Sequence, residues 1–372
     1  MPSDPTVVFR VDASTDMGNG HAMRCLALAD ELRTRGAQCC FVSRPHRGNL
    51  VSMIDARGFA VRVLRAPAPA RRPLPGHQDW LGADWYDDAR ETCAMLGTRR
   101  IDWLVVDHYA IDSRWEQRVR AQARRLLVID DLADRPHDCD ILLDQNLGAT
   151  PQDYAPWIAP GCVTLIGPRH ALLRPQFARR RAQSLLRRKV PQLHRLLITM
   201  GGVDKDNATS LVLDALGACA LPETMRISVV MGPHAPWIDA VRDRASRMHV
   251  PTEVLTGVED MADLMSRADL AIGAAGATSW ERCVLGLPSI VVAVAQNQHA
   301  IARALDSAGA AIASGIDELP ATLAGIFADP LAPAIDLRSL GVAASSVTDG
   351  HGASLVASIM TDFDCHGHHL PL

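Results

Sequence analysis

The sequence predicts an α/β protein built from two Rossmann-like domains, each with a doubly wound parallel sheet. Short apolar strands alternate with segments of helical length, which is the pattern of βαβ units. This alternation runs twice, once from residue 6 and again from residue 196, and a charged stretch separates the two series. We expect an N-terminal domain over 1–175, a C-terminal domain over 190–335, and a C-terminal helix and tail over 336–372.

The first series begins with a strand at Thr6–Asp12 and a helix over His21–Arg35, in which small and apolar residues recur at helical spacing and Gly36 follows as a C-terminal stop. Further apolar runs predict strands at Cys39–Ser43, Val61–Leu64, Trp103–Asp107 and Leu126–Asp130. The stretch 66–82 is rich in Pro, Ala and Arg and is expected to be a loop.

The second series begins with a strand at Leu196–Met200 and a helix over Asn207–Gly217. Its further strands are expected at Ile227–Met231, Glu253–Leu255, Leu270–Gly273 and Ser289–Val294. We place the linker near residues 170–192. Ligands of such sheets bind at the carboxyl ends of the strands, so both domains are expected to face one cleft.

Composition excludes several classes of function. With 38 Lys and Arg against 42 Asp and Glu, the net charge of -4 argues against a nucleic-acid partner. No apolar run reaches the roughly 18 residues that span a bilayer, and no secretory signal is visible, so no membrane insertion is expected. Nine scattered cysteines without a CxxC pair are typical of reduced thiols, which favours a cytoplasmic protein.

The first candidate site follows the strand that ends at Asp12. Gly18 and Gly20 precede a helix start and let the backbone approach a ligand closely. The third glycine of the dinucleotide fingerprint is missing, which argues against NAD. His21 lies at the helix N-terminus, where a neutral imidazole suits a general base. The alternative is that His21 only caps or packs the turn.

Polar residues also follow a later strand of the first series. Asp107 and Tyr109 stand at the carboxyl end of the strand Trp103–Asp107, where sites form in parallel sheets. Capping of a helix is the competing role for such an Asp.

The second series carries three further candidate segments. Gly201 and Gly202 form a glycine turn before a helix. The turn containing Gly276, Thr278, Ser279 and Glu281 combines small residues, hydroxyls and a helix start, which suits a phosphate, and Glu281 could accept hydrogen bonds from a ribose diol. A tightly packed turn, with Glu281 stabilising the helix, is the alternative. Asn297 and Gln298 follow the last long strand and can both donate to and accept from sugar groups.

Together these segments resemble the pseudaminic acid pathway hydrolase family, UDP-2,4-diacetamido-2,4,6-trideoxy-beta-L-altropyranose hydrolase. The resemblance starts at FRVDASTDMGNGHAMRCLALADELR and continues through VVDHYAID, VIDDLADRPHDCDILLDQN, TMGGVDKDN and AIGAAGATSWERCVLGLP to NQ. It covers about residues 7–310, with the motifs in order and at matching spacings. The GxGH opening with MRC and the ExxxLGLP stretch are its most specific parts.

The resemblance implies a glycosyltransferase-B-like fold and a reaction in which water attacks the anomeric carbon of a UDP-sugar. It implies His21 as the catalytic base, and neither metal nor cofactor is expected. The implied substrate-binding residues are Asp12, Gly20, Arg24, Asp107, Tyr109, Asn297 and Gln298, and the implied UDP-binding residues are Gly201, Gly202, Gly276, Thr278, Ser279 and Glu281.

The expected partner is therefore a small UDP-sugar, handled by a monomer in a pathway that supplies flagellin glycosylation. Two alternatives stay open at this point. A glycosyltransferase of the same fold would bind an acceptor where water would be, and a sugar-nucleotide binding protein would not catalyse; the presence of His21 in GNGH argues against the latter.

Overall fold

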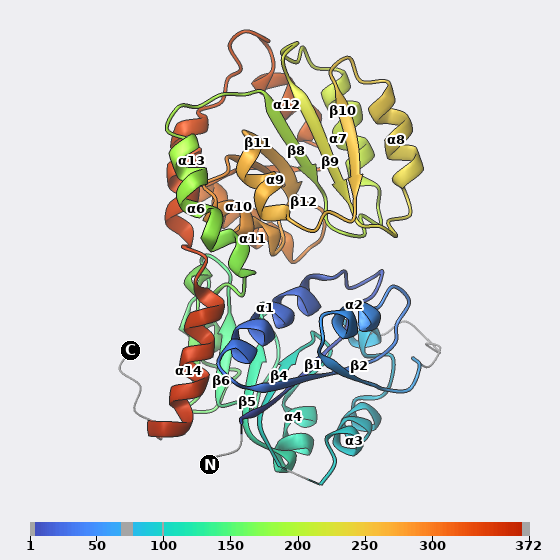
Figure 1. Cartoon of the computed structure of the whole chain (residues 1–372), viewed down its shortest axis with the longest axis vertical. Helices are drawn as coiled ribbons and strands as arrows, with labels where there is room; N and C mark the ends of the chain where they lie inside the picture. Colours follow the sequence, from blue (N-terminus) through green and yellow to red (C-terminus); the bar gives the residue numbers. More distant parts are fainter. Residues whose placement is uncertain (1–3, 68–76, 99, 367–372) are drawn as a thin grey trace. The chain divides into compact units, whose positions relative to one another are not determined.

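The computed structural model describes residues 4–67, 77–98 and 100–366, and it confirms the α/β class with two doubly wound parallel sheets (Figure 1). The chain divides into two compact units, residues 1–172 with 351–372 and residues 173–350. The middle of the expected loop 66–82 and the end of the C-terminal tail lie outside the described residues.

The sheet of the first unit has seven parallel strands in the order β3-β2-β1-β4-β5-β6-β7. Because β1 lies between β2 and β4, the chain turns in opposite directions on the two sides of the β1/β4 pair, which makes this pair the switch point of the sheet. Sequence reasoning missed β6 and β7, which are short. The strands are β1 (Thr6–Val11), β2 (Gln38–Ser43), β3 (Ala60–Val63), β4 (Ile101–Asp107), β5 (Ala123–Ile129), β6 (Ile141–Asp144) and β7 (Val163–Ile166).

Helices cover both faces of this sheet, because side chains of β1 alternate between two apolar cores. Val7, Phe9 and Val11 pack in one core with α1 (Gly20–Thr34) and α14 (Gly352–His366). Val8 packs in the other core with α3 (Trp85–Leu96) and α4 (Ser113–Val119). The shorter elements are α2 (Val51–Ala56), α5 (Pro151–Tyr154) and the 3₁₀ helices η1 (Gln78–Leu81), η2 (Arg120–Gln122) and η3 (Pro168–His170).

The sheet of the second unit repeats the same winding with six parallel strands, in the order β10-β9-β8-β11-β12-β13. Its switch point is the β8/β11 pair. Sequence reasoning missed only β13 here. The strands are β8 (Arg195–Thr199), β9 (Arg226–Met231), β10 (Thr252–Thr256), β11 (Leu270–Ala274), β12 (Ser289–Ala293) and β13 (Ile312–Gly315).

The core of the second unit lies where α7, α8 and α12 cover the sheet, with Val212, Val241 and Leu323 buried against the strands. The remaining helices complete the unit. The helices are α6 (Pro175–Arg187), α7 (Ala208–Gly217), α8 (Ile238–Ser246), α9 (Met261–Arg267), α10 (Thr278–Val284), α11 (Gln298–Ser307), α12 (Leu319–Ile326) and α13 (Leu337–Val347).

The stretch expected to link the domains is largely a helix of the second unit. α6 starts with a proline in its first turn and buries Phe177 and Ser184. Arg181 of α6 donates to the backbone oxygens of Val284 and Ser345, which ties this helix to the rest of the second unit. The chain leaves the first unit at Leu172 and returns to it at His351, so α14 belongs to the first unit and packs beside α1 (Figure 1).

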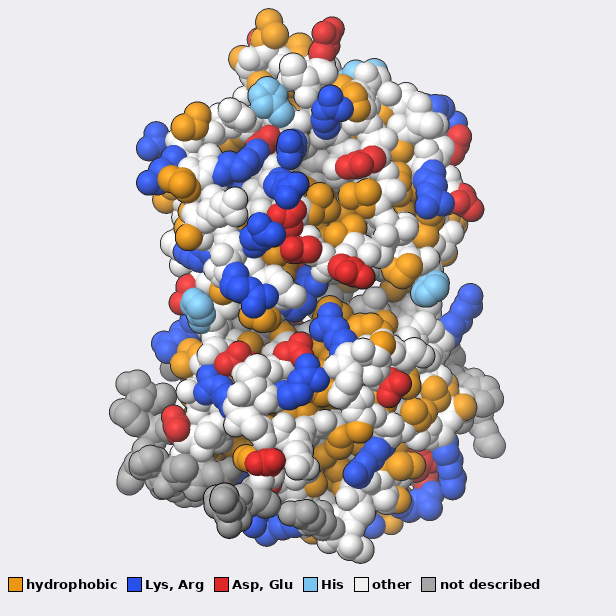
Figure 2. Space-filling model, in the orientation of Figure 1, with side chains coloured by type: hydrophobic (Ala, Val, Ile, Leu, Met, Phe, Trp, Pro, Cys, Tyr) orange, Lys and Arg blue, Asp and Glu red, His pale blue; other side chains and the backbone are white. Residues whose placement is uncertain are grey.

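The described surface mixes charges of both signs. On the face shown in Figure 2, acidic and basic side chains are interspersed rather than gathered by sign. None of the helices in the described part of the chain combines the length and apolar character needed to cross a membrane.

Candidate active site

The structure brings the predicted residues of the first unit to the switch point of its sheet. Asp12 follows β1 and Asp107 ends β4, which are neighbouring parallel strands. The loop after β1 leads into α1, whose second residue is His21. Gly18 has a left-handed backbone (φ 76°), which lets this loop turn before the helix, and Gly20 opens α1 with no heavy atom near the position of a Cβ.

His21 and Asp107 form a buried hydrogen-bonded pair. Nδ1 of His21 lies 2.6 Å from Oδ1 of Asp107, and the side chain of Asp107 is fully buried. Nε and Nη2 of Arg24 each donate to Asp107 at 2.7 Å. Burial alone raises the pKa of Asp107, but the positive charge of Arg24 and the contact with His21 outweigh burial and hold the pKa well below its usual range.

This geometry assigns the tautomer of His21. An ionised Asp107 only accepts hydrogen bonds and lies 2.6 Å from Nδ1, whereas the donor Nη2 of Arg24 is farther from Nδ1, at 3.2 Å, and already donates to Asp107 at 2.7 Å. Nδ1 of His21 therefore carries the proton and donates to Asp107. The lone pair of the ring is left on Nε2, the nitrogen that a general base needs.

Arg24 and Asp107 were predicted to bind substrate, and the structure engages both in holding His21. Nη1 of Arg24 also donates to Asp131 at 2.9 Å, so the guanidinium is clamped between two carboxylates. Asp107 is 0% exposed and Arg24 is 6% exposed. Their geometry fits orientation of His21 better than contact with a ligand.

Asp12 is likewise enclosed by the protein. Its Oδ1 accepts from the backbone N–H of Arg44 at 2.6 Å and pairs with Arg10 at 2.7 Å. Nδ1 of His108 accepts from the N–H of Ala110, so its Nε2 carries the proton that faces Asp12 at 3.3 Å. Asp12 is 1% exposed, so its expected contact with substrate has no accessible surface, and the carboxylate instead ties β1 to the strand ends beside it.

Aromatic rings surround the imidazole of His21. The edge of Tyr109 lies against it, with ring centroids 4.6 Å apart. His77 and Trp80 from the segment around η1 reach the same Tyr109, at 4.9 Å and 5.7 Å between ring centroids. Tyr109 is therefore near His21 as predicted, while the loop that supplies the other two rings was not predicted to contribute.

In the second unit, the glycine turn after β8 is hydrogen-bonded to the residue that follows β9. The carbonyl of Gly202 accepts from the N–H of Gly232 at 3.0 Å. Asp204 caps α7, accepting from the N–H groups of Ala208 and Thr209 at 2.8 and 2.9 Å. The carboxylate of Asp204 already caps the start of α7, so that helix N-terminus is not free for a phosphate. In this segment, the turn at Gly201 and Gly202 remains a candidate for UDP binding.

In the turn after β11, Gly276 and Glu281 are partly exposed, whereas Ser279 is buried. Ser279 is 1% exposed, and its hydroxyl accepts from the buried guanidinium of Arg282 at 2.9 Å, while the Thr278 hydroxyl accepts from the same group at 3.3 Å. Burial lowers the pKa of Arg282 to about 10. The hydroxyls thus shape the turn, and Ser279 has no surface for a nucleotide.

Glu281 has an ion-pair partner that sequence reasoning missed. Arg174, at the start of α6, donates to its Oε1 at 3.1 Å, and both side chains are 14% exposed. Burial raises the pKa of Glu281, although the charge of Arg174 opposes this. The pair holds the carboxylate of Glu281 in place through its Oε1.

Asn297 and Gln298 lie where α11 begins, beside the Gly276 turn. Asn297 is exposed, and Gln298 accepts from the N–H of Val294 at 3.1 Å. A Cβ on Gly276 would lie 3.9 Å from Nε2 of Gln298, so these two segments meet at the carboxyl edge of β11 and β12.

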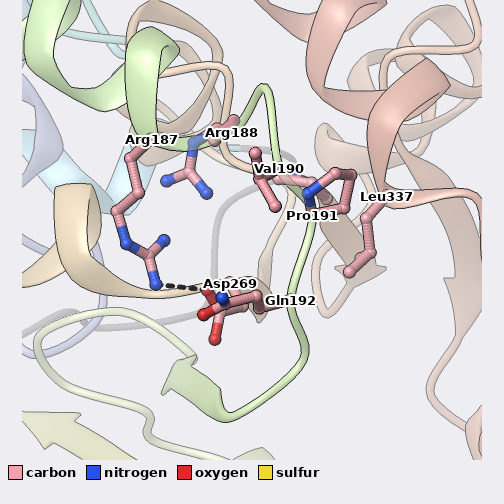
Figure 3. Close-up of a pocket in the computed structure, with 8 residues that line it drawn as sticks. Arg187, Arg188, Val190, Pro191, Gln192, Asp269 and Leu337 are labelled. Atoms are coloured by element: carbon pink, nitrogen blue, oxygen red, sulfur yellow. Dashed lines mark hydrogen bonds and ion pairs between the residues drawn. The ribbon is translucent and has the colours of Figure 1, made fainter.

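A pocket in the second unit lies away from these residues (Figure 3). It is lined by Arg187, Arg188, Pro191, Gln192 and Asp269 among others, and Arg187 forms an ion pair with Asp269. Asp269 directly precedes β11, so the pocket lies at the amino edge of the sheet, opposite the edge where sites form.

Two pairs of carboxylates with described side chains have the Asp-x-Asp spacing of metal-dependent sugar transferases, Asp138 with Asp140 and Asp204 with Asp206, and one carboxylate of each pair is used structurally. Asp140 accepts from Arg120, Arg125 and the N–H of Leu126. Asp204 caps α7 as described above. Within the described residues, no group of three or more His, Cys, Asp or Glu side chains is placed to hold a metal ion.

Comparison with known proteins places these observations in a family context. Residues 195–328 match the glycosyltransferase family 28 C-terminal domain. This family 28 domain spans the switch point of the second sheet and the Gly276 turn. The chain is 24% identical over 303 residues to UDP-2,4-diacetamido-2,4,6-trideoxy-beta-L-altropyranose hydrolase of Campylobacter jejuni, which covers 82% of this chain and 97% of that protein. The resemblance inferred from the motifs is thus confirmed.

Two further proteins bear on the extent of the similarity. The chain is 24% identical over 290 residues to an uncharacterized protein of Methanocaldococcus jannaschii, covering 77% of this chain but only 55% of that relative's length. The MurG structure from Acinetobacter baumannii matches with a TM-score of 0.67 and 15% identity, covering 96% of this chain and 99% of that one. The latter shows the fold alone, and it confirms the glycosyltransferase-B-like architecture around a family 28 domain.

Proposed function

We propose that this protein is a UDP-sugar hydrolase that uses His21 as a general base. The observation that carries the proposal is the His21–Asp107–Arg24 arrangement, in which a buried, ionised carboxylate fixes the proton on Nδ1 and leaves Nε2 as the acceptor. A histidine that merely capped the turn would not need this buried carboxylate as a partner.

The residues suggest a single displacement by water. Nε2 of His21 takes a proton from water as its oxygen attacks the anomeric carbon. Asp107 stabilises the positive charge that the ring acquires, and Arg24 keeps Asp107 ionised. Attack opposite the departing UDP inverts the anomeric configuration. UDP is a good leaving group, so a strong general acid is not required as in ordinary glycoside hydrolysis.

In this proposal, residues of the second unit bind the UDP. Oε2 of Glu281 accepts from the ribose diol, and the backbone at Gly201, Gly202 and Gly276 approaches the diphosphate where no Cβ intervenes. Asn297 and Gln298 bind the sugar through their amides, which can donate and accept.

The substrate that we propose is UDP-2,4-diacetamido-2,4,6-trideoxy-beta-L-altropyranose. Its support is the Campylobacter relative of that name, which aligns along nearly its whole length. The reaction would then be a step of pseudaminic acid biosynthesis that supplies flagellin glycosylation. We further propose that the enzyme acts as a monomer. A cytoplasmic location is also proposed, because the described cysteines are free thiols, as in a reducing compartment.

The decisive experiment measures UDP release from this substrate without any acceptor. The wild type should release UDP, and in ¹⁸O-water the label should appear on the sugar. His21→Asn keeps size and polarity but has no basic nitrogen, so its turnover should fall by about 10²–10⁴-fold while UDP affinity is kept. Label on UDP, or near-normal turnover of His21→Asn with only a lower melting temperature, would refute the mechanism.

A glycosyltransferase is the second candidate, because the family 28 domain carries that description. It would need an acceptor hydroxyl in place of water. No UDP release from the wild type alone, followed by release when an acceptor is added, would favour the transferase over the hydrolase.

A further inference from the structure

The segment His77–Gly82 is fixed firmly beside His21, although it comes from the stretch that composition marked only as a loop. Leu81 is 2% exposed and packs in the core with Ala89 and Leu96. Gly82 has a left-handed backbone (φ 66°), and a Cβ there would lie 2.8 Å from Cε1 of His46. Leu81 and Gly82 therefore fix the end of this segment against the core and against His46, which also restricts the position of Trp80 just before them.

Two rings of this segment, His77 and Trp80, form an aromatic wall with Tyr109. The ring centroids of His77 and Trp80 are 4.5 Å apart, edge to face. Trp80 lies nearly parallel to Tyr109, with 23° between the ring planes. Tyr109 in turn contacts His21, so the wall adjoins the base that the proposed reaction uses.

The accessible part of this wall belongs to the loop rings. Tyr109 is 8% exposed, as is His21, whereas His77 and Trp80 are half-buried. Trp80 and His77 thus offer more accessible ring surface to a ligand beside His21 than Tyr109 does. Aromatic faces bind C–H groups and methyl groups, and they offer little to hydroxyls.

The wall is also uncharged near neutral pH. Burial lowers the pKa of His77, and the positive charge of Arg135 lowers it further, while the negative charges of Asp134 and Asp131 oppose this. A neutral His77 beside Trp80 gives an uncharged aromatic surface at the edge of an otherwise charged site, with the ring face of Trp80 as its apolar part.

We propose that Trp80 and His77 determine substrate specificity by binding the methyl-bearing side of a deoxy sugar next to His21. This inference rests on the proposed function. A methyl group at C6 fits the ring face of Trp80, while a hydroxymethyl group at the same carbon would lose hydrogen bonds to water without finding a partner on that face. The wall thus favours 6-deoxy sugars over their 6-hydroxy counterparts.

The test compares two substrates that differ only at C6, UDP-2-acetamido-2,6-dideoxyglucose and UDP-N-acetylglucosamine. The wild type should show a higher kcat/KM for the 6-deoxy compound. Trp80→Ala should reduce that preference by about 10-fold, mainly through KM, since one methyl contact and one unpaired hydroxyl are at stake. Trp80→Phe keeps an aromatic face and should retain the preference to within about 3-fold.

Controls separate specificity from folding. Tyr86→Ala removes an exposed aromatic ring from α3 of the same unit and should leave the preference unchanged. The affinity of Trp80→Ala for UDP alone should equal that of the wild type, because other residues are proposed to hold UDP. An unchanged C6 preference in Trp80→Ala, or an equal loss for both sugars together with weaker UDP binding, would overturn the inference.

The same assay distinguishes the two levels of proposal. If the wild type releases UDP from neither substrate nor from the diacetamido-trideoxy sugar, the proposed function fails. If the wild type releases UDP and Trp80→Ala behaves as the wild type does, the proposed function stands and the aromatic wall is refuted.

Discussion

Replacing Asp107 by Asn should inactivate the protein without removing its proposed base. Asp107 accepts the Nδ1 proton of His21 and two bonds from Arg24. An Asn has a single oxygen, and in either orientation its NH₂ group meets a donor of Arg24, because Arg24 donates to both oxygens of Asp107. Where that oxygen faces Nε of Arg24, the NH₂ group donates to Nδ1 of His21, which moves the ring proton to Nε2 and removes the lone pair that water needs. In both orientations the negative charge that stabilises a protonated His21 is lost.

The expected rate loss is that of losing the base, about 10²–10⁴-fold in kcat. Stability should also fall, because charge-assisted bonds to a fully buried carboxylate are worth about 1.5–3 kcal/mol each. A net loss of about 3 kcal/mol would lower the melting temperature by about 6–12 °C for a unit of this size. UDP affinity should not change, since the proposed UDP contacts lie in the second unit.

The assay is UDP release under saturating substrate, with calorimetric UDP binding and a thermal melt for each variant. The decisive comparison is the double variant with His21→Asn. If Asp107 acts only through His21, the double variant should turn over no more slowly than His21→Asn alone. Rate losses that multiply would show that Asp107 acts independently and would refute the assigned tautomer role.

Three further predictions follow from the described contacts. Glu281→Ala should weaken UDP binding about 10-fold by calorimetry, the loss of about one charge-assisted bond, with little change in the thermal melt; unchanged affinity would leave Glu281 as a partner of Arg174 only. UDP release should persist in EDTA, since Asp140 and Asp204, one carboxylate of each of two Asp-x-Asp pairs, already bind groups of the protein itself; recovery by magnesium after a loss would contradict this. Burial and the neighbouring Asp131 raise the pKa of Asp144 to about 7, compared with about 3.9 in the unfolded chain. Between these two pH values the folded state binds more protons than the unfolded state, so the free energy of unfolding should fall as pH rises from about 4 to about 7. Asp144→Asn should remove this cost, stabilising the protein at pH 8 by up to about 4 kcal/mol and hardly at all at pH 4; an equal effect at both values in urea titrations would disprove the shift.

Much of the fold could be predicted because each element carries its own periodic signal. The strands β1 and β8, and the helices α1 and α7, are local patterns of apolar spacing followed by glycine turns. The four-residue strands β6, β7 and β13 were missed, because four residues show a period only weakly, whereas β3, of the same length, was found. The linker was placed near residues 170–192 because a charged stretch separates the two series of strands, although Phe177 and Ser184 of α6 are buried there.

Sequence position alone also placed His21, Asp107 and Tyr109 together, since the carboxyl ends of β1 and β4 meet at the switch point. It could not divide their roles. Whether a carboxylate faces a ligand or orients a neighbour depends on burial and on which donors surround it, and these come from elements distant in the chain. Asp107 and Asp12 were therefore expected at the substrate, and tertiary packing enclosed both.

The sequence by itself determined the two parallel sheets, their glycine turns and the residue types at the strand ends, because these depend on neighbours within a few positions. Only the tertiary structure decided that Arg24 clamps Asp107, that Arg174 holds Glu281, and that Trp80 reaches the ring of Tyr109. The two residues are 83 positions apart in the first pair, 107 in the second and 29 in the third. In the third pair, Trp80 also comes from a loop with no periodic pattern. Such contacts arise from long-range packing, which no local pattern encodes.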